Sequence, residues 1–204
     1  GTTAQKERWA LDLLTMGKIG SWAITEPDSG SDAFGSMKAT AKRDGDEYVL
    51  NGSKTFITNG QLANLIVVVA KTDTQKGAKG TSLIMIETPA LPGFRRGRIL
   101  DKIGQKAQDT AELIFEDVRV PASCLLGEVP GRGFSQMMFD LPYERMIIAV
   151  AAVAAMEGAL DATRQYVKER QAFGKAIGDF QHSRFTLAEA ATIARVARSF
   201  VDDC

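Results

Sequence analysis

Residues 51–60 read NGSKTFITNG, a run of β-branched and aromatic residues between two Asn-Gly pairs. The first pair is a strong signal for a hairpin turn, because asparagine and glycine tolerate the positive φ angles that such a turn requires. Side chains alternate along a strand, so Phe56 and Thr58 share one face and Ile57 lies on the other. An aromatic near a hydroxyl could lie against a flat cofactor, although an aromatic in a strand usually packs in the core.

Similar segments lie on both sides of this stretch, from residue 20 to about residue 130. They are short, rich in β-branched and aromatic residues, and separated by glycine, aspartate, asparagine and proline. The segments are GSWAIT (20–25), MKATAKR (37–43), EYVLNG (47–52), LIVVVAKT (65–72), SLIMIET (82–88) and AELIFEDVRV (111–120). Many short strands at near-regular spacing predict a small antiparallel barrel or sandwich.

The apolar pattern becomes helical after PGRG at 130–133. One long helix is predicted over 135–169 and a second from about 180 to the end, with two glycines breaking the segment between them. Two helices joined in this way form an antiparallel hairpin, which cannot bury both faces of both helices alone. A shorter amphipathic helix is predicted over 3–16.

The composition is typical of a soluble globular protein, since 45% of the 204 residues are hydrophobic and 25% are charged. Basic and acidic residues both number 25, so the net charge is zero and does not indicate nucleic-acid binding. The one basic cluster, residues 95–98, is short and is expected in a solvated loop. No uncharged run reaches the length of a membrane span, and the N-terminus does not resemble a signal peptide.

Several classes of site are excluded by motifs that the chain lacks. It has neither a glycine-rich dinucleotide fingerprint nor a phosphate-loop motif, which argues against nicotinamide dehydrogenases and phosphate-loop nucleotidases. The single histidine, His182, excludes a site of several imidazoles and is expected on the surface near a helix start. Cys124 and Cys204 follow no metal or redox spacing, which indicates a reducing intracellular compartment and no metal site.

Residues 25–35, TEPDSGSDAFG, follow the first predicted strand and combine hydroxyls, acids and glycines. One interpretation is an exposed turn. The other is a loop whose backbone N–H groups and hydroxyls bind a polar heterocycle or a phosphate. The composition leaves both open.

Glu144 and Arg145 are adjacent in an otherwise apolar helical segment, LPYERM (141–146). On a helix they project about 100° apart, so they do not form an ordinary intrahelical pair. A carboxylate among apolar neighbours is costly to bury, which suits a general base acting where water is excluded. The alternative is an exposed glutamate at a helix edge.

Five stretches, in this order, resemble the acyl-CoA dehydrogenase family and most closely its long-chain branch. They are AITEPDSGSD (23–32), NGSKTFITNG (51–60), GQKAQDTAELIFEDVRVP (104–121), DLPYERMIIA (140–149) and RQAFGKAIGDFQ (170–181). The resemblance implies an α+β fold in three parts. These are the end of an N-terminal helical domain (1–20), a middle antiparallel β-barrel (21–132) and the first two helices of a C-terminal four-helix bundle (133–204). Because neither end of the chain shows a helix cap or breaker, we expect a fragment of a longer protein.

The resemblance also implies FAD, with its isoalloxazine ring between barrel and bundle. One group of residues would contact the ring, and a second would reach the pyrophosphate and adenosine of a neighbouring subunit's FAD. The first group is Ile24, Thr25, Ser31, Phe56 and Thr58, and the second is Arg170, Phe173 and Gln181.

The reaction implied by the resemblance is α,β-dehydrogenation of an acyl-CoA thioester, as in fatty-acid β-oxidation. Glu144 matches the base of the long-chain and isovaleryl branches, which removes the α-proton while a hydride leaves the β-carbon for the flavin. The expected substrate-binding residues are Ser31, Asp140, Tyr143 and Arg145, of which Arg145 also holds local structure. Near Ser31, Asp28-Ser29 departs from the commoner Gly-Ala of the family.

The implied partners are the acyl-CoA substrate, electron-transfer flavoprotein as electron acceptor, and further copies of the chain in a homodimer or homotetramer. The implied location is the bacterial cytoplasm or the mitochondrial matrix. Two alternatives stay open. One is a flavoenzyme like acyl-CoA oxidase or nitroalkane oxidase, which passes electrons to oxygen. The other is a truncated, non-catalytic module without bound flavin.

Overall fold

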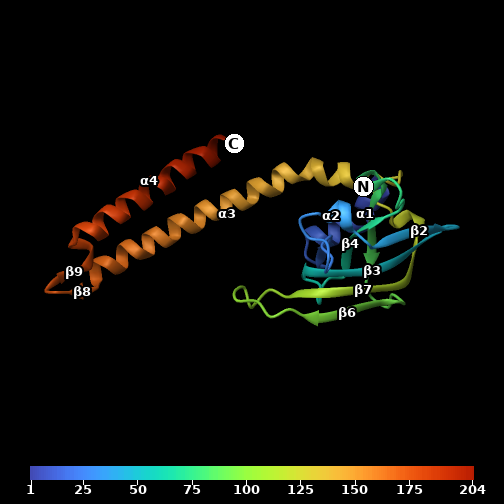
Figure 1. Ribbon diagram of the computed structural model, residues 1–204, viewed down its shortest axis with the longest axis horizontal. Coiled ribbons are helices and arrows are strands. Elements are labelled where there is room, and N and C mark those ends of the chain that lie inside the picture. Colours follow the sequence, from blue (N-terminus) through green and yellow to red (C-terminus); the bar gives the residue numbers. More distant parts are fainter. The chain divides into compact units, whose positions relative to one another are not determined.

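Seven strands between residues 20 and 121 form one curled sheet in the computed structural model, which describes residues 1–204 (Figure 1). Their order is β1-β4-β2-β3-β7-β6, and β5 pairs with β4. The strands are β1 (Gly20–Ala23), β2 (Thr40–Asp44), β3 (Glu47–Thr58), β4 (Leu65–Lys71), β5 (Thr81–Glu87), β6 (Phe94–Ile99) and β7 (Thr110–Pro121). The expected barrel is confirmed as a half-barrel, in which β1 and β2 pair with β4 in parallel and the other pairs are antiparallel.

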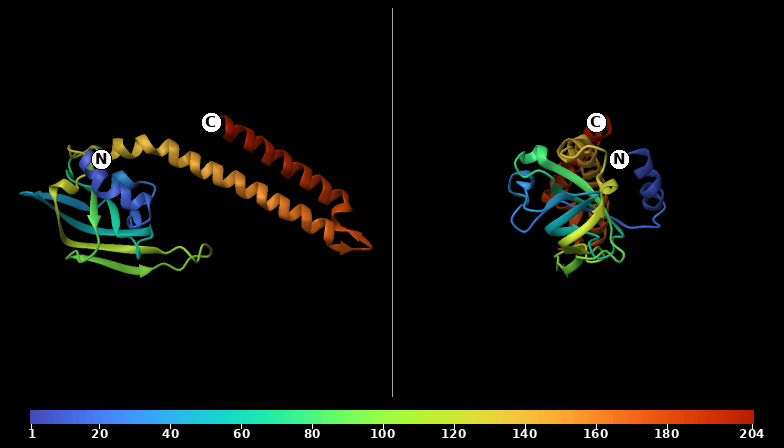
Figure 2. Two further views of the ribbon diagram at one scale, coloured as in Figure 1. Left: turned by 180° about the vertical axis from the view of Figure 1, so that it is seen from behind. Right: turned by 90° about the vertical axis from the view of Figure 1, so that its right-hand side faces the viewer.

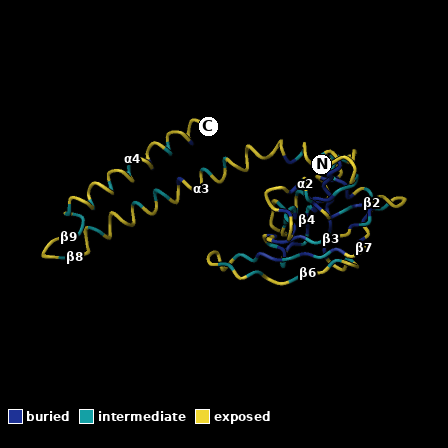
Figure 3. Tube along the Cα trace, viewed as in Figure 1, coloured by how far each residue is buried: buried dark blue, intermediate teal, exposed yellow.

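The core of this sheet is built on β4 and β5, whose apolar runs are buried on both faces. Ile66 and Val69 on β4, and Ile84 and Ile86 on β5, are fully inaccessible to solvent. Strands covered on both faces have nearly continuous apolar sequences, because no side chain can alternate into water. The dark-blue, buried segments of Figure 3 therefore gather in the sheet.

The hairpin turn expected at 51–52 is wrong, because EYVLNG and KTFITNG are two halves of the single strand β3. The pairing of β3 with β7 shifts register between Leu50 and Gly52. There, the Asn51 side chain donates to Asp117 Oδ1 and accepts from the Asp117 backbone N–H, each at 2.9 Å. Gly52 has φ 139° and packs against Ala39. The Asn-Gly pair therefore forms a bulge, which bends the strand instead of reversing it.

The solvated loop expected at 95–98 is also wrong, since these residues lie in β6 and pair with β7. Arg96 points back over the sheet edge and donates to the carbonyls of Gly60 and Ala63 at 3.2 and 2.8 Å. The outer two arginines form ion pairs with glutamates on β7. The three arginines of the basic cluster are thus all paired with acceptors within the first unit.

Helix α1 (Thr3–Leu14) begins with a capping box, so the expected absence of an N-terminal cap is wrong. The Thr2 hydroxyl accepts from the Gln5 N–H at 3.3 Å, and Gln5 Oε1 accepts from the Thr2 N–H at 2.9 Å. Trp9 is only 3% exposed and donates from Nε1 to Glu87 Oε1 at 2.9 Å. Helix α1 is therefore anchored to β5 by a buried indole and its hydrogen bond.

Residues 1–137 and 138–204 form two separate units. The second unit is a helical hairpin of α3 (Gly133–Glu169), which begins in the first unit, and α4 (Gln181–Asp203), as Figure 2 shows. A small antiparallel ribbon of β8 (Gln171–Ala172) and β9 (Lys175–Ala176) joins them. The remaining short helices are α2 (Ala33–Ser36) and three 3₁₀ turns at Gly77–Gly80, Ala122–Cys124 and Ile177–Asp179. Both predicted long helices are therefore confirmed.

The hairpin is held by a narrow apolar seam and one strong ion pair. Val153, Ala194 and Val201 are buried. Arg198 donates from Nε and Nη2 to the two oxygens of Glu157 at 3.0 and 2.7 Å. The guanidinium holds the pKa of the Glu157 carboxyl below its ordinary value.

By length and composition alone, α3 could cross a membrane. Its charge-free run covers only residues 146–156. A span needs about 20 apolar residues, so this run is too short. Glu157, the next residue, is committed to Arg198. The composition of α3 is thus that of an apolar bundle helix.

The contact between α1 and β5 predicts a pH-dependent stability. The Trp9 indole N–H, together with the Arg8 guanidinium, lowers the pKa of Glu87 from its ordinary 4.5. A carboxyl with a lowered folded-state pKa stabilises above its unfolded pKa, and this is lost as the pH falls through the folded value. Glu87→Gln should therefore lower the Tm more at pH 7 than at pH 3, measured by circular dichroism. An equal loss at both pH values would contradict this.

The bulge in β3 predicts a position that tolerates no side chain. A Cβ at Gly52 would lie 2.8 Å from Ala39 Cα and Cβ, at a φ of 139° that L-residues rarely adopt. Gly52→Ala should therefore lower the free energy of unfolding by about 2 kcal/mol or more in chemical denaturation. Gly30→Ala is the control, because its Cβ would meet open space. Equal stability of the two variants would show that the bulge is not constrained.

Candidate functional site

The loop after β1 and the end of β3 lie side by side and bring together four of the residues expected to contact a flavin. The Ser21 hydroxyl donates to the Thr58 carbonyl at 2.6 Å, and the Thr55 N–H donates to the Thr25 carbonyl at 2.9 Å. Ile24 and Phe56 lie between these two links. Segments about thirty residues apart thus form one surface.

This surface presents exposed aromatic side chains. Phe56 is 66% exposed at φ 58°, and Thr58 is exposed, while Ile57 between them is 2% exposed. The predicted alternation is therefore confirmed. A bulky residue at positive φ costs free energy, and such strain concentrates at functional sites. Trp22 on β1 is 42% exposed and was missed from the sequence. Its exposure could have been expected from the alternation of side chains along a strand, because its neighbour Ala23 is apolar and buried.

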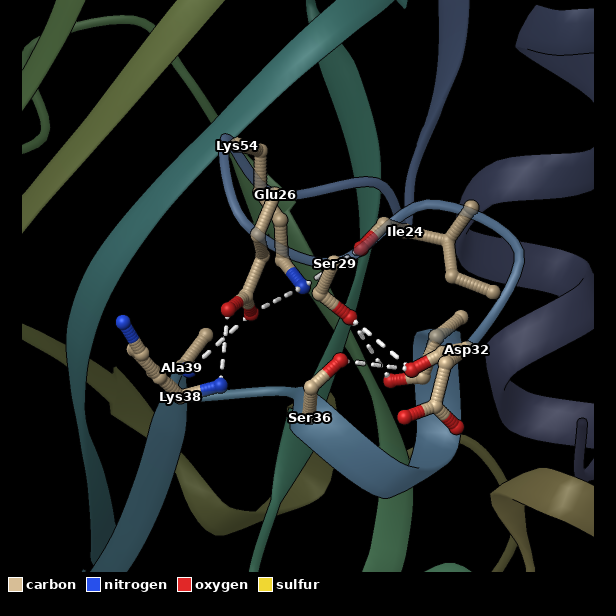
Figure 4. Close-up of polar contacts among 9 residues, drawn as sticks. Ile24, Glu26, Ser29, Asp32, Ser36, Lys38, Ala39 and Lys54 are labelled. Carbon is tan, nitrogen blue, oxygen red and sulfur yellow. Dashed lines mark hydrogen bonds and ion pairs between the residues drawn. The ribbon is translucent and has the colours of Figure 1, made fainter.

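Beneath this surface lies an ion pair that the sequence did not reveal (Figure 4). Lys54 has no exposed surface, and its Nζ lies 2.9 Å from Glu26 Oε1, where Glu26 is 5% exposed. Lys54 Nζ also donates to the Ile24 carbonyl at 2.8 Å. Burial lowers the pKa of the Lys54 ammonium, and the Glu26 carboxylate opposes that shift. The pair therefore ties the loop that follows β1 to β3.

The loop has an exposed side and a buried side. Ser31 is exposed, and Asp28 forms an exposed ion pair with Lys38 at 2.8 Å. Ser29 is only 2% exposed, and its hydroxyl donates to the Asp32 and Ala33 carbonyls. Of the two nearby serines, Ser31 is thus free to meet a ligand and Ser29 is used internally.

The segment around Glu144 is helical, as predicted, and Pro142 lies inside α3. Proline has no N–H, so one carbonyl of the preceding turn loses its helical donor. The side chains of Asp140, Tyr143, Glu144 and Arg145 are all exposed in this unit. The ion pairs of α3 lie further along the helix, at Asp161 and at the Glu157 pair described above, so Glu144 and Arg145 stay uncommitted.

The second group of residues expected to bind FAD lies at the β8–β9 end of the helical hairpin. Arg170 follows α3, Phe173 occupies the ribbon turn at φ 52°, and Gln181 is the first residue of α4. Phe173 is 95% exposed. Lys175, which the sequence did not single out, lies with its Nζ 4.3 Å from the centre of the Phe180 ring. Cations, an amide and two aromatic rings therefore cluster at this end.

Comparison with known proteins accounts for both units. Residues 21–118 match the family described as acyl-CoA dehydrogenase, middle domain, and residues 131–204 match acyl-CoA dehydrogenase, C-terminal domain. The chain belongs to the acyl-CoA dehydrogenase family. It is 49% identical to the mitochondrial long-chain specific acyl-CoA dehydrogenase of Mus musculus, over 100% of this chain and 47% of that protein. It therefore spans about half the length of the curated relatives that it matches.

Solved structures support the same fold. The crystal structure of acyl-CoA dehydrogenase from Geobacillus kaustophilus aligns with a TM-score of 0.95 and 48% identity, over 100% of this chain and 53% of that one. A structure described as electron transferring flavoprotein of Acidaminococcus fermentans aligns with a TM-score of 0.93 and 43% identity, over 100% and 53%. The expected fold class and family are thereby confirmed.

Acyl-CoA dehydrogenases are FAD-dependent flavoproteins, and the surface on β1 and β3 fits that cofactor. Isoalloxazine is flat and carries polar atoms along its edge. The exposed aromatic side chains of Trp22 and Phe56 suit stacking on such a ring, and the neighbouring threonines carry hydroxyls that suit its edge. Phe56 keeps an unfavourable φ although most of its side chain is exposed, as expected for a preformed cofactor surface.

Proposed function

We propose that this chain supplies the flavin-binding and catalytic region of an acyl-CoA dehydrogenase. The observation that carries the proposal is the strained, exposed Phe56 on the surface that the end of β3 and the loop after β1 form, in a chain of this family. Ile24 and Thr25 would meet the ring edge through their backbone, and Ser31 would lie near the entering thioester. Arg170, Phe173 and Gln181 would bind the pyrophosphate and adenosine, since cations and amides pair well with a diphosphate.

Glu144 is proposed as the base. Its carboxylate takes the α-proton of the acyl-CoA thioester, and the electron pair of that C–H bond forms the new double bond as a hydride leaves the β-carbon. FAD, when bound, supplies the acceptor for that hydride. Glu144 suits the role because no cation neutralises it, and because the apolar turns around it keep water away once a substrate chain lies against them. Asp140, Tyr143 and Arg145 are proposed to position the substrate around it.

The proposed base predicts the effect of one isosteric substitution. In the full-length protein, Glu144→Gln should lower kcat with a long-chain acyl-CoA by at least about 100-fold, because the amide cannot accept the proton. Bound FAD, measured by visible absorbance, should be unchanged. Asp161→Asn, on the same helix, is the matched control and should keep its activity. Turnover by Glu144→Gln near the wild-type level would disprove the assignment.

Electron-transfer flavoprotein is proposed as the partner that accepts electrons. The proposal is supported by a solved structure that this chain matches, whose description names electron transferring flavoprotein. The full-length protein should therefore oxidise acyl-CoA only with added electron-transfer flavoprotein and should consume no oxygen alone. Oxygen uptake with release of hydrogen peroxide would instead identify an oxidase. A wild-type protein that binds no FAD would favour the non-catalytic alternative.

Self-association is proposed from the apolar surface of α4. Phe185, Ile193, Val196 and Phe200 are each more than half exposed. We expect this apolar stripe to be buried, either against further helices or against a second copy of the chain in a homodimer or homotetramer. The relatives include mitochondrial and bacterial enzymes, so the proposed location is the mitochondrial matrix or the bacterial cytoplasm.

A further inference from the structure

The largest fully buried side chain of the protein is a lysine, Lys54, and the strand that carries it also carries the exposed Phe56 and Thr58. Its ammonium group has two acceptors, Glu26 Oε1 at 2.9 Å and the Ile24 carbonyl at 2.8 Å. Both acceptors belong to the loop after β1. Figure 4 shows the lysine reaching from β3 into that loop.

The Glu26 carboxylate closes the loop at its other end. Its Oε2 accepts from the Lys38 N–H at 2.7 Å, and its Oε1 accepts from the Ala39 N–H at 3.0 Å. The backbone of Glu26 also pairs with Ser29 in both directions, at 3.0 and 3.1 Å. One carboxylate therefore ties the start of the loop, its end and β3 together.

Two successive carbonyls are held against β3 by this arrangement. The Ile24 carbonyl accepts from Lys54 Nζ, and the Thr25 carbonyl accepts from the Thr55 N–H at 2.9 Å. A trans peptide is planar, and its N–H points opposite to its C=O. All peptide bonds here are trans. Since the Ile24 carbonyl points inward to Lys54, the Thr25 N–H points the other way, out of the buried interior.

A buried ion pair is a poor way to gain stability alone. Replacing such a pair by apolar residues of similar volume is often neutral or stabilising, because both charges lose their hydration. An apolar pair, however, has no donor for the Ile24 carbonyl and no acceptor for the N–H groups of Lys38 and Ala39. Glu26 and Lys54 therefore fix the geometry of the backbone, and they contribute little to the net stability of the fold.

We propose that Lys54 and Glu26 are positioning residues that aim the Thr25 N–H at the edge of the flavin ring. This inference rests on the proposed FAD site and adds a mechanism for its preorganisation. A fixed donor stabilises the electron-rich reduced ring more than the oxidised one, because it needs no reorganisation when charge develops. Loss of the pair therefore weakens FAD binding and makes the flavin harder to reduce.

The experiment uses the full-length protein and three variants. Lys54→Met removes the anchor of the Ile24 carbonyl but leaves the buried Glu26 carboxylate without its counter-ion, which also destabilises the fold. The double variant Glu26→Gln/Lys54→Met removes that unpaired charge without restoring the anchor. Lys38→Met is the matched control, because it breaks the exposed pair with Asp28 in the same loop, where both side chains are 73% exposed. The readouts are the Kd for FAD, the flavin absorption spectrum, the reduction potential and the Tm.

We expect the double variant to recover the Tm lost by Lys54→Met while its Kd for FAD stays at least tenfold higher than that of the wild type. Its potential should be more negative, and a tenfold weaker preference for reduced FAD corresponds to about 30 mV for a two-electron couple. Lys38→Met should match the wild type. If Lys54→Met does not fold, the double variant decides.

Two outcomes would overturn the inference, and they differ. A double variant with the wild-type Kd, spectrum and potential would show that the pair is merely structural, and would leave the proposed function intact. A wild-type protein that binds no FAD would remove both the proposed function and the inference resting on it.

Discussion

The register shift between Lys54 and Ile57 in the pairing of β3 with β7 is the constraint on which the candidate site depends. In a regular strand, Lys54, Phe56 and Thr58 would share one face. The extra residue at the shift lets Lys54 and Thr55 both point into the protein while Phe56 turns outward at φ 58°. A single backbone irregularity thus places a charged anchor and an exposed aromatic two residues apart, on opposite sides of the same strand.

The long, strongly patterned elements could be predicted from the sequence. The helices at 133–169 and 181–203, and the strands at 65–71 and 81–87, follow from periodicity and apolar runs, because burial leaves little freedom in those patterns. The alternation of side chains along a strand likewise predicts that Phe56 and Thr58 share one face. These elements carry most of the fold, and the family resemblance supplied the rest of its outline.

What could not be predicted depends on partners far away in the chain. Asn51 and Gly52 carry the signal of a hairpin turn, but hydrogen bonds to Asp117, sixty-six residues on, hold them in a bulge. The sequence around Arg96 predicts a loop, but in the structure its guanidinium donates to the carbonyls of Gly60 and Ala63, which are more than thirty residues away in the chain. In a regular strand, Lys54 would lie on the same face as the exposed Phe56 and Thr58, and the register shift turns it into the interior instead. Local propensity loses in each case to a contact that a one-dimensional pattern does not contain.

The closure of the loop by Glu26 has a consequence for which parts of this site can change independently. Because one carboxylate fixes residue 26 to the backbone of residues 38 and 39, the segment between them begins and ends at fixed points. Its interior can therefore change in sequence or length at little entropic cost and without moving the neighbouring backbone of Ile24 and Thr25. A substitution in residues 27–37, at Ser31 for example, can thereby change a contact to a ligand while the backbone of Ile24 and Thr25 keeps its position.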